Sequence, residues 1–129
     1  GLAKLTDLVD FSAQANSLPA ITDFQTIVFS NKTRTILANV WGQGDQFLLA
    51  AFADDDDADL YTTSIKVDKN ILNNHHVNIP KALVMKIIGT DGFPKKENDF
   101  VYTNTSEKMD YLEFTGTLRP NELLLVTTQ

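Results

Sequence analysis

Apolar residues at the start of the chain recur at the spacing of an α-helix. They are Leu2, Leu5, Leu8, Val9 and Ala13. We expect a helix over residues 4–15, because the proline at position 19 pushes the residue before it toward extended conformations. The polar pair Asn16–Ser17 supports an end at that point.

From residue 24 onward, short runs rich in β-forming residues alternate with turn signals. The runs cover residues 24–30, 33–41, 46–53, 60–67, 82–88, 100–105, 110–118 and 123–128. The strongest turn is Gly42–Gln43–Gly44–Asp45, where two glycines can take positive φ. Short strands at a spacing of roughly 8–12 residues are typical of a small antiparallel barrel or sandwich. We therefore predict a mostly β domain with one N-terminal helix.

Local pairing is the simplest arrangement of these strands. We expect runs 24–30 and 33–41 to form a hairpin across Asn31–Lys32, and runs 46–53 and 60–67 to flank an acidic hairpin loop. The composition of 46–53 also suits a helix, but Asp54–Asp57 would then lie at the negative end of its dipole. That would cost a few tenths to about 1 kcal/mol for each aspartate, so a strand is favoured.

One segment resembles a known family. Gly44–Asp45 followed by Phe47–Asp55 is similar to the segment that ends the helical layer of NTF2-like α+β cone domains. The resemblance covers about a dozen residues and implies an α+β cone as the alternative fold. The remainder departs from that pattern: two preceding helices are lacking, and Asn-His-His-Val-Asn stands where the family keeps a helix. We therefore assign the chain to no family.

Composition narrows the class of protein. The 129 residues suit a single globular domain, 43% of them are hydrophobic, and the net charge is −6. Clustered basic residues are lacking, which argues against nucleic-acid binding, and the longest apolar run, Phe47–Ala53, is too short to cross a bilayer. With no cysteine and no targeting signal, the localisation stays open. A chain beginning with Gly1 suggests an excised domain or a tag remnant.

The densest charge cluster lies between runs 46–53 and 60–67. Asp55, Asp57 and Asp59 have the spacing that opens an EF-hand loop, and carboxylate oxygens suit Ca²⁺. The sixth position is Leu60 instead of glycine, and the twelfth is Lys66 instead of glutamate. We therefore expect at most a weak calcium site on a solvated loop.

Two adjacent histidines are the other candidates for chemistry. His75 and His76 could contribute a polar contact to a pocket, although neighbouring residues on a strand point to opposite faces. Neither a Gly-x-Ser-x-Gly elbow nor a complete phosphate loop is present, and we interpret Glu97 and Asp99 beside Lys95 as solvated charge. An enzymatic role is thus the less favoured one.

Two aromatic residues flank the glycine-containing turns. Trp41 precedes Gly42, and Phe93 lies between Gly92 and Pro94. Aromatic side chains at loop tips can anchor a protein or carbohydrate partner. Our leading hypothesis is a non-enzymatic binding or structural module, such as part of a viral or cell-surface assembly. The alternative is a small-molecule binder or an enzyme, with a barrel or cone around an apolar pocket.

The calcium hypothesis has a direct test. We expect millimolar Ca²⁺ to leave the melting temperature nearly unchanged, because the ligands that organise a tight site are missing. Thermal unfolding with and without Ca²⁺ measures this. A rise of several degrees that Asp55→Asn and Asp57→Asn abolish would establish specific binding instead.

Overall fold

The computed structural model describes residues 2–23, 26–27, 36–54, 61–95 and 103–128. Its elements in chain order are α1 (Leu2–Ser17), β1 (Ala20–Ile21), β2 (Thr26–Ile27), β3 (Ile36–Gln43), β4 (Gln46–Ala53), β5 (Tyr61–Asp68), α2 (Lys69–Asn74), β6 (Leu83–Ile88), β7 (Thr103–Glu107), β8 (Tyr111–Leu118) and β9 (Leu123–Thr128). This is the predicted mostly β fold with an N-terminal helix.

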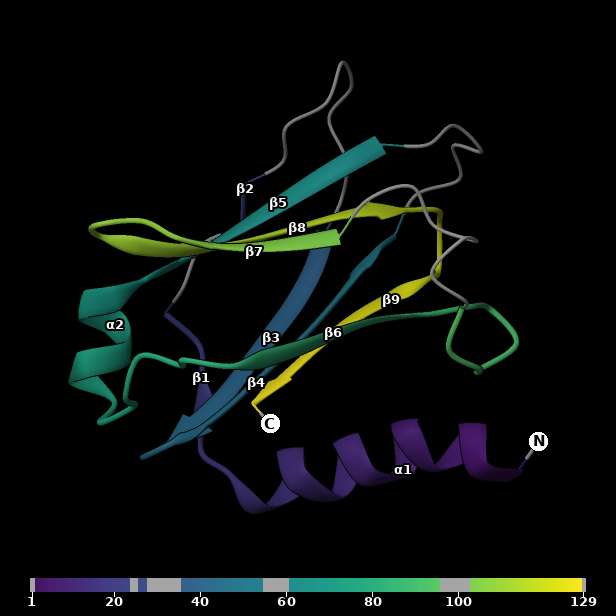
Figure 1. The fold of residues 1–129 in the computed structure, drawn as a ribbon, viewed down its shortest axis with the longest axis horizontal. Helices are drawn as coiled ribbons and strands as arrows, with labels where there is room; N and C mark the ends of the chain where they lie inside the picture. The colour runs from purple at the N-terminus through teal and green to yellow at the C-terminus, as the bar shows by residue number, and fades with distance from the viewer. Residues whose placement is uncertain (1, 24–25, 28–35, 55–60, 96–102, 129) are drawn as a thin grey trace.

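The strands form two separate antiparallel sheets that pack face to face as a sandwich. The five-stranded sheet has the order β1-β3-β4-β9-β6, and the four-stranded sheet has the order β2-β5-β8-β7. In Figure 1, the five-stranded sheet lies between the four-stranded sheet above and α1 below. The last strand, β9, is inserted between β4 and β6, so the C-terminal strand pairs with two segments from the middle of the chain.

The space between the sheets is filled by a single apolar core. Phe47 of β4 and Phe114 of β8 stack across it, with ring centroids 5.6 Å apart. Both rings are fully buried. Gly116 on β8 faces the same core, and a Cβ there would lie 3.5 Å from Leu124 of β9. The two sheets therefore approach closely at this point, because Gly116, which has no side chain, faces the large side chain of Leu124.

Helix α1 covers the outer face of the five-stranded sheet. Phe11, 8% exposed, packs with Leu48, Ile88 and Leu125, which belong to three different strands. Central strands β4 and β9 are thus covered on both faces, which explains why Phe47–Leu49 and Leu124–Val126 are buried at every position. Covered antiparallel strands lose the alternation of polar and apolar residues, as strands in parallel sheets do.

The predicted turn at Gly42–Asp45 is confirmed, whereas the described strands do not pair as the two predicted hairpins require. The β3–β4 hairpin closes at the pair Gln43 and Gln46, and Gly44 takes a φ of 60° in its two-residue turn. By contrast, β2 pairs with β5 while β3 pairs with β1 and β4. Strands β4 and β5, which flank the acidic segment in sequence, likewise belong to different sheets. Local patterns identify strands, but the choice of sheet depends on long-range packing.

The remaining expectations concern single elements and the alternative fold. Residues 46–53 and 83–88 are strands, as predicted, and α1 is longer than the expected range 4–15. The segment that resembles the cone domains is strand β4, so the sandwich is adopted and the cone alternative is wrong. Helix α2, directly after β5, was not predicted from the sequence. It is capped by Asp68, whose carboxylate accepts a hydrogen bond from the Asn70 N–H at 2.7 Å.

The attachment of α1 rests on Phe11. We expect Phe11→Ala to lower the free energy of unfolding by about 3 kcal/mol, because it removes the largest buried group between helix and sheet. Urea denaturation measures the loss, and hydrogen exchange should show α1 amides losing protection before those of β4. A loss below about 1 kcal/mol would mean that the helix is held by other contacts.

Candidate functional site

The outer side of the five-stranded sheet brings the two aromatic candidates to the same helix. Trp41 on β3 is half-buried, and its ring meets that of Phe11 edge to face, with centroids 5.8 Å apart and an interplanar angle of 81°. Trp41 therefore packs as part of the helix–sheet contact and still presents part of its surface to solvent. Two apolar side chains on this side remain strongly exposed: Val9 at 65% and Leu37 at 46%. We call the surface of α1 with Trp41, Leu37 and Phe93 the α1 side.

A shallow hollow of about 190 Å³ opens between α1 and strands β6 and β9. Its lining consists of Asp10, Phe11, Gln14, Val84, Lys86, Leu125 and Thr127. Phe11 and Leu125 supply an apolar floor, while Asp10 on the helix and Lys86 on β6 supply groups of opposite charge. The hollow lies outside the sandwich and is separate from the core between the sheets.

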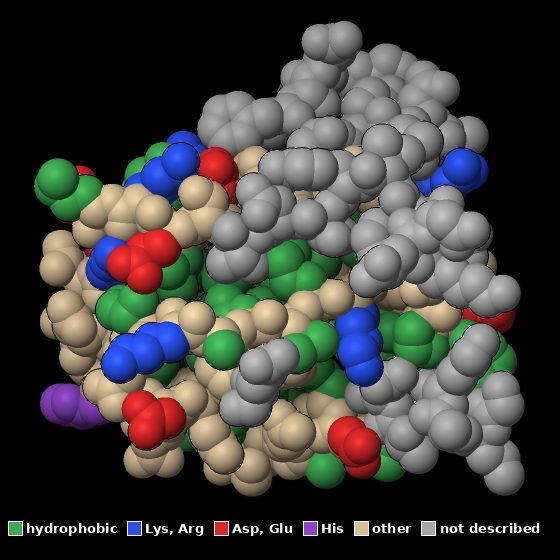
Figure 2. Space-filling model, in the orientation of Figure 1, with side chains coloured by type: hydrophobic (Ala, Val, Ile, Leu, Met, Phe, Trp, Pro, Cys, Tyr) green, Lys and Arg blue, Asp and Glu red, His purple; other side chains and the backbone are tan. Residues whose placement is uncertain are grey.

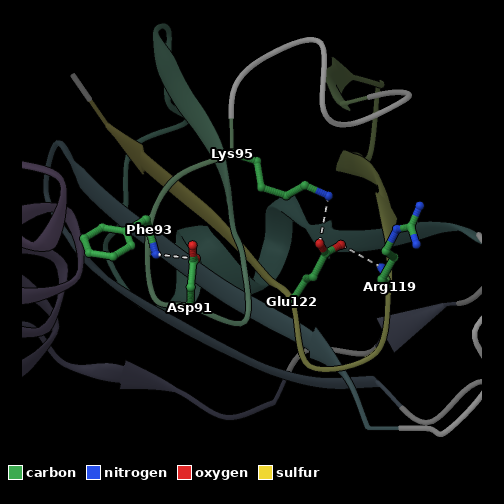
Figure 3. A network of polar contacts seen from close by, with 5 residues as sticks. All are labelled: Asp91, Phe93, Lys95, Arg119 and Glu122. Carbon is green, nitrogen blue, oxygen red and sulfur yellow. Dashed lines mark hydrogen bonds and ion pairs between the residues drawn. The ribbon is translucent and has the colours of Figure 1, made fainter. Parts of the chain in front are cut away.

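Phe93 belongs to the turn that follows β6. The Phe93 N–H donates to the Asp91 carboxylate at 3.0 Å, and its carbonyl accepts from the Gly89 N–H at 2.9 Å. The ring is half-buried and points toward the side on which α1 runs (Figure 3). A Cβ on Gly92 would lie 3.9 Å from Leu8 of α1. Phe93 and Trp41 thus sit near different parts of the same helix.

A nearly buried ion pair lies beside this turn (Figure 3). The Lys95 ammonium is 2.8 Å from the Glu122 carboxylate, and their side chains are 18% and 7% exposed. The other Glu122 oxygen accepts from the Arg119 N–H at 2.9 Å. Lys95 and Glu122 come from loops far apart in sequence, so this pair ties the β6–β7 loop to the β8–β9 turn.

A second hollow, open and about 510 Å³ in volume, lies at the end of the sandwich. It is lined by Asp45, Asn78, Ile79, Pro80, Lys81, Ala82 and Thr128. The Asn78 amide donates to the Asp45 carboxylate at 2.7 Å, which fixes one rim. The hollow is lined by one acidic residue, Asp45, and one basic residue, Lys81.

The two histidines end helix α2. His76, with a φ of 58°, donates its N–H to the Asn73 carbonyl, and the Val77 N–H bonds the Leu72 carbonyl. This pair of bonds is a Schellman motif, completed by apolar contact of the buried Val77 and Leu72. The His75 ring nitrogen Nε2 lies 3.0 Å from an Asp23 carboxylate oxygen. Neither histidine lines the two hollows described above.

The candidate calcium ligands are Asp55, Asp57 and Asp59, and all three lie outside the described residues. The weak calcium site therefore stays a prediction. Within the described ranges, no group of three or more His, Cys, Asp or Glu side chains could hold a metal ion. In the same ranges, neither helix is long and apolar enough to span a membrane.

Sequence reasoning missed the nearly buried ion pair. Lys95 was interpreted as part of a solvated cluster, and Glu122 was not singled out. The one available signal was the placement of Glu122 directly before the apolar run 123–126, which predicts a carboxylate at the mouth of the core. The lysine that neutralises it is 27 positions away, and no local pattern identifies it.

Comparison with known proteins yields no relative. No protein-family model matches the chain, and neither a curated protein nor a solved structure matches it. The candidate surfaces must therefore be judged on their own geometry.

The αL conformation of His76 has a measurable cost. A side chain with a Cβ is disfavoured in that region, so we expect His76→Gly to raise the free energy of unfolding by about 0.5–1 kcal/mol. The control is His76→Ala, which removes the imidazole but keeps the Cβ and should give no gain. Urea denaturation of both variants distinguishes them. A destabilised glycine variant would show that the imidazole makes a stabilising contact.

Proposed function

We propose that this chain is a non-enzymatic binding or structural module that contacts its partner through the α1 side. The observation that carries the proposal is where the two hollows lie: both open on the outside of the sandwich, while the space between the sheets holds a cluster of buried apolar side chains. A packed core provides a scaffold, and scaffolds commonly present binding groups on their surface.

The chemistry of the α1 side supports this choice. The side chains of Val9 and Leu37 are apolar and exposed, so they are not part of the buried core of the sandwich. Half-buried Trp41 and Phe93 combine large contact area with few rotatable bonds, as the anchors of interfaces do. The partner we expect is a protein or a carbohydrate, in an assembly of the viral or cell-surface type.

The open hollow favours a second candidate function, the binding of a small molecule. Its volume of about 510 Å³ is within the range of roughly 300–1,000 Å³ for ligand sites. The opposite charges of Asp45 and Lys81 would suit a zwitterionic molecule. We rank this function second because the hollow is open and Asp45 is already bonded to Asn78.

Variants that place charge on the α1 side test the first proposal. Val9→Lys and Leu37→Lys should each reduce partner capture from an extract of the source organism, or binding on a glycan array, at least about tenfold. Met109→Lys is the matched control. It also replaces an exposed apolar side chain by lysine, but Met109, 89% exposed, lies on the β7–β8 turn away from α1. Phe93→Ala should weaken association and lower the melting temperature less than Phe11→Ala does, because its ring is only half-buried.

The readouts separate the two functions. The single tryptophan, Trp41, should change its fluorescence when a partner covers the α1 side. Equal capture by wild type and all α1-side variants would rule that surface out. If Asp45→Asn and Lys81→Ala instead abolished NMR shifts caused by small zwitterions, the second candidate would replace the first.

A further inference from the structure

Helix α1 is too narrow to cover the whole outer face of the five-stranded sheet. Five strands spaced about 4.8 Å apart make a face about 19 Å wide, whereas a helix with its side chains is about 10–12 Å across. In Figure 1, α1 runs along this face below the strands. A single helix in this position leaves part of the sheet surface beside it.

The strand pairing identifies the residues that are left beside the helix. Leu37, Phe52, Leu123 and Ile88 form one row across β3, β4, β9 and β6, and directly paired residues share a face of the sheet. Ile88 belongs to the cluster under α1 and is 1% exposed, whereas Leu37 at the other end of the row is 46% exposed. Phe52 is half-buried, and Asn39 on β3 is exposed. We call Leu37, Asn39 and Phe52 the β3–β4 patch.

The flank of α1 next to this patch carries a further exposed apolar side chain. Asp10 and Gln14, four positions apart, line the shallow hollow on the β6 and β9 side of the helix. Val9 and Ser12 lie on the opposite flank, toward β3 and β4, and both are exposed. Three large apolar side chains are strongly exposed among the described residues, and two of them, Val9 and Leu37, therefore border the same area.

The end of β4 next to the patch is acidic. Phe52 is separated by one residue from Asp54, which is exposed and begins the sequence run Asp54–Asp57. On the face shown in Figure 2, by contrast, the described acidic and basic side chains are interspersed. The net charge of −6 has the same sign as the run. A partner segment with basic side chains is therefore complementary to this end of the patch.

We propose that the β3–β4 patch binds a basic amphipathic helix of a partner protein, which lies beside α1 as a second helix on the outer face. A helix suits this position because helices pack side by side at about 8–10 Å, and the small Ser12 permits close approach. An added strand would need the hydrogen-bonding groups of a sheet edge, whereas the patch lies on a sheet face. The apolar stripe of the bound helix contacts Val9, Leu37 and Phe52, and its basic residues face Asp54.

The inference rests on the proposed binding role of the α1 side and adds the class of partner. The probe is a synthetic helical peptide of about 15 residues, about 22 Å long, with leucines on one face and lysines on the other. Titration should change the Trp41 fluorescence and yield a Kd. A peptide of the same composition, with the leucines distributed over all faces, should bind at least about tenfold more weakly.

Variants of the protein locate the bound peptide. Val9→Ser and Leu37→Ser should each raise the Kd at least about tenfold, because they remove apolar contact without adding charge. Gln14→Ser is the matched control on the other flank of α1 and should bind as wild type does. Asp54→Asn should raise the Kd and reduce its dependence on salt, whereas Asp10→Asn, also an exposed aspartate, should change neither.

The outcomes distinguish this inference from the proposed function. Equal binding of the two peptides, or equal Kd values for wild type, Val9→Ser and Leu37→Ser, would overturn the helix proposal. If the lysine variants at Val9 and Leu37 still weaken capture of the natural partner or glycan, the α1 side remains the binding surface and only the class of partner is wrong. If those variants also leave capture unchanged, the proposed function fails as well.

Discussion

Burial on both faces of the five-stranded sheet is the constraint on which this structure depends. Strands β4 and β9 carry apolar side chains at consecutive positions, so neither face of these strands can be left to water. One face is satisfied by the four-stranded sheet, where Phe47 stacks on Phe114. The other requires α1, whose Phe11 reaches three strands. The layer order of the molecule follows from that requirement.

The polar groups next to these layers are held by specific partners. Among the described residues, every buried side-chain nitrogen and oxygen has a hydrogen-bond partner. Ser64 and Thr115 bond to each other across the four-stranded sheet, and the Thr128 hydroxyl accepts from the Phe47 N–H. The Schellman motif and the Glu122 contacts do the same for two chain reversals. Since an unsatisfied buried group costs about 1–3 kcal/mol, the loss of any one of these bonds should destabilise the fold.

Much of the fold could be predicted from the sequence, because strand formation and turns are encoded locally. The β-branched and aromatic runs, the Gly44 turn and the N-terminal helix all follow from patterns within about ten residues. Sheet membership could not be predicted in this way. Strands β4 and β5 are consecutive in sequence, yet they belong to different sheets, because each chooses the neighbour that buries its apolar face.

The candidate site was harder to predict from the sequence, because it too depends on contacts between distant parts of the chain. Trp41 and Phe93 could be identified one by one as aromatics near glycine turns, and their roles as partner contacts stay predictions. That both lie near α1 depends on a helix some 30 and 80 positions away. The Lys95–Glu122 ion pair needed the same long-range information, because the burial of Glu122 can be understood only with Lys95 beside it.

The position of β9 has a consequence for the order in which this chain can fold. β4 and β6 leave the ribosome before the strand that lies between them, so neither can complete its pairing during synthesis of the segments that precede β9. Closing the sheet joins distant parts of the chain, which is slow compared with hairpin formation. Until β9 emerges, β4 has its β3 neighbour but an open second edge, and β6 lacks its β9 partner; exposed apolar edges of this kind are prone to aggregation.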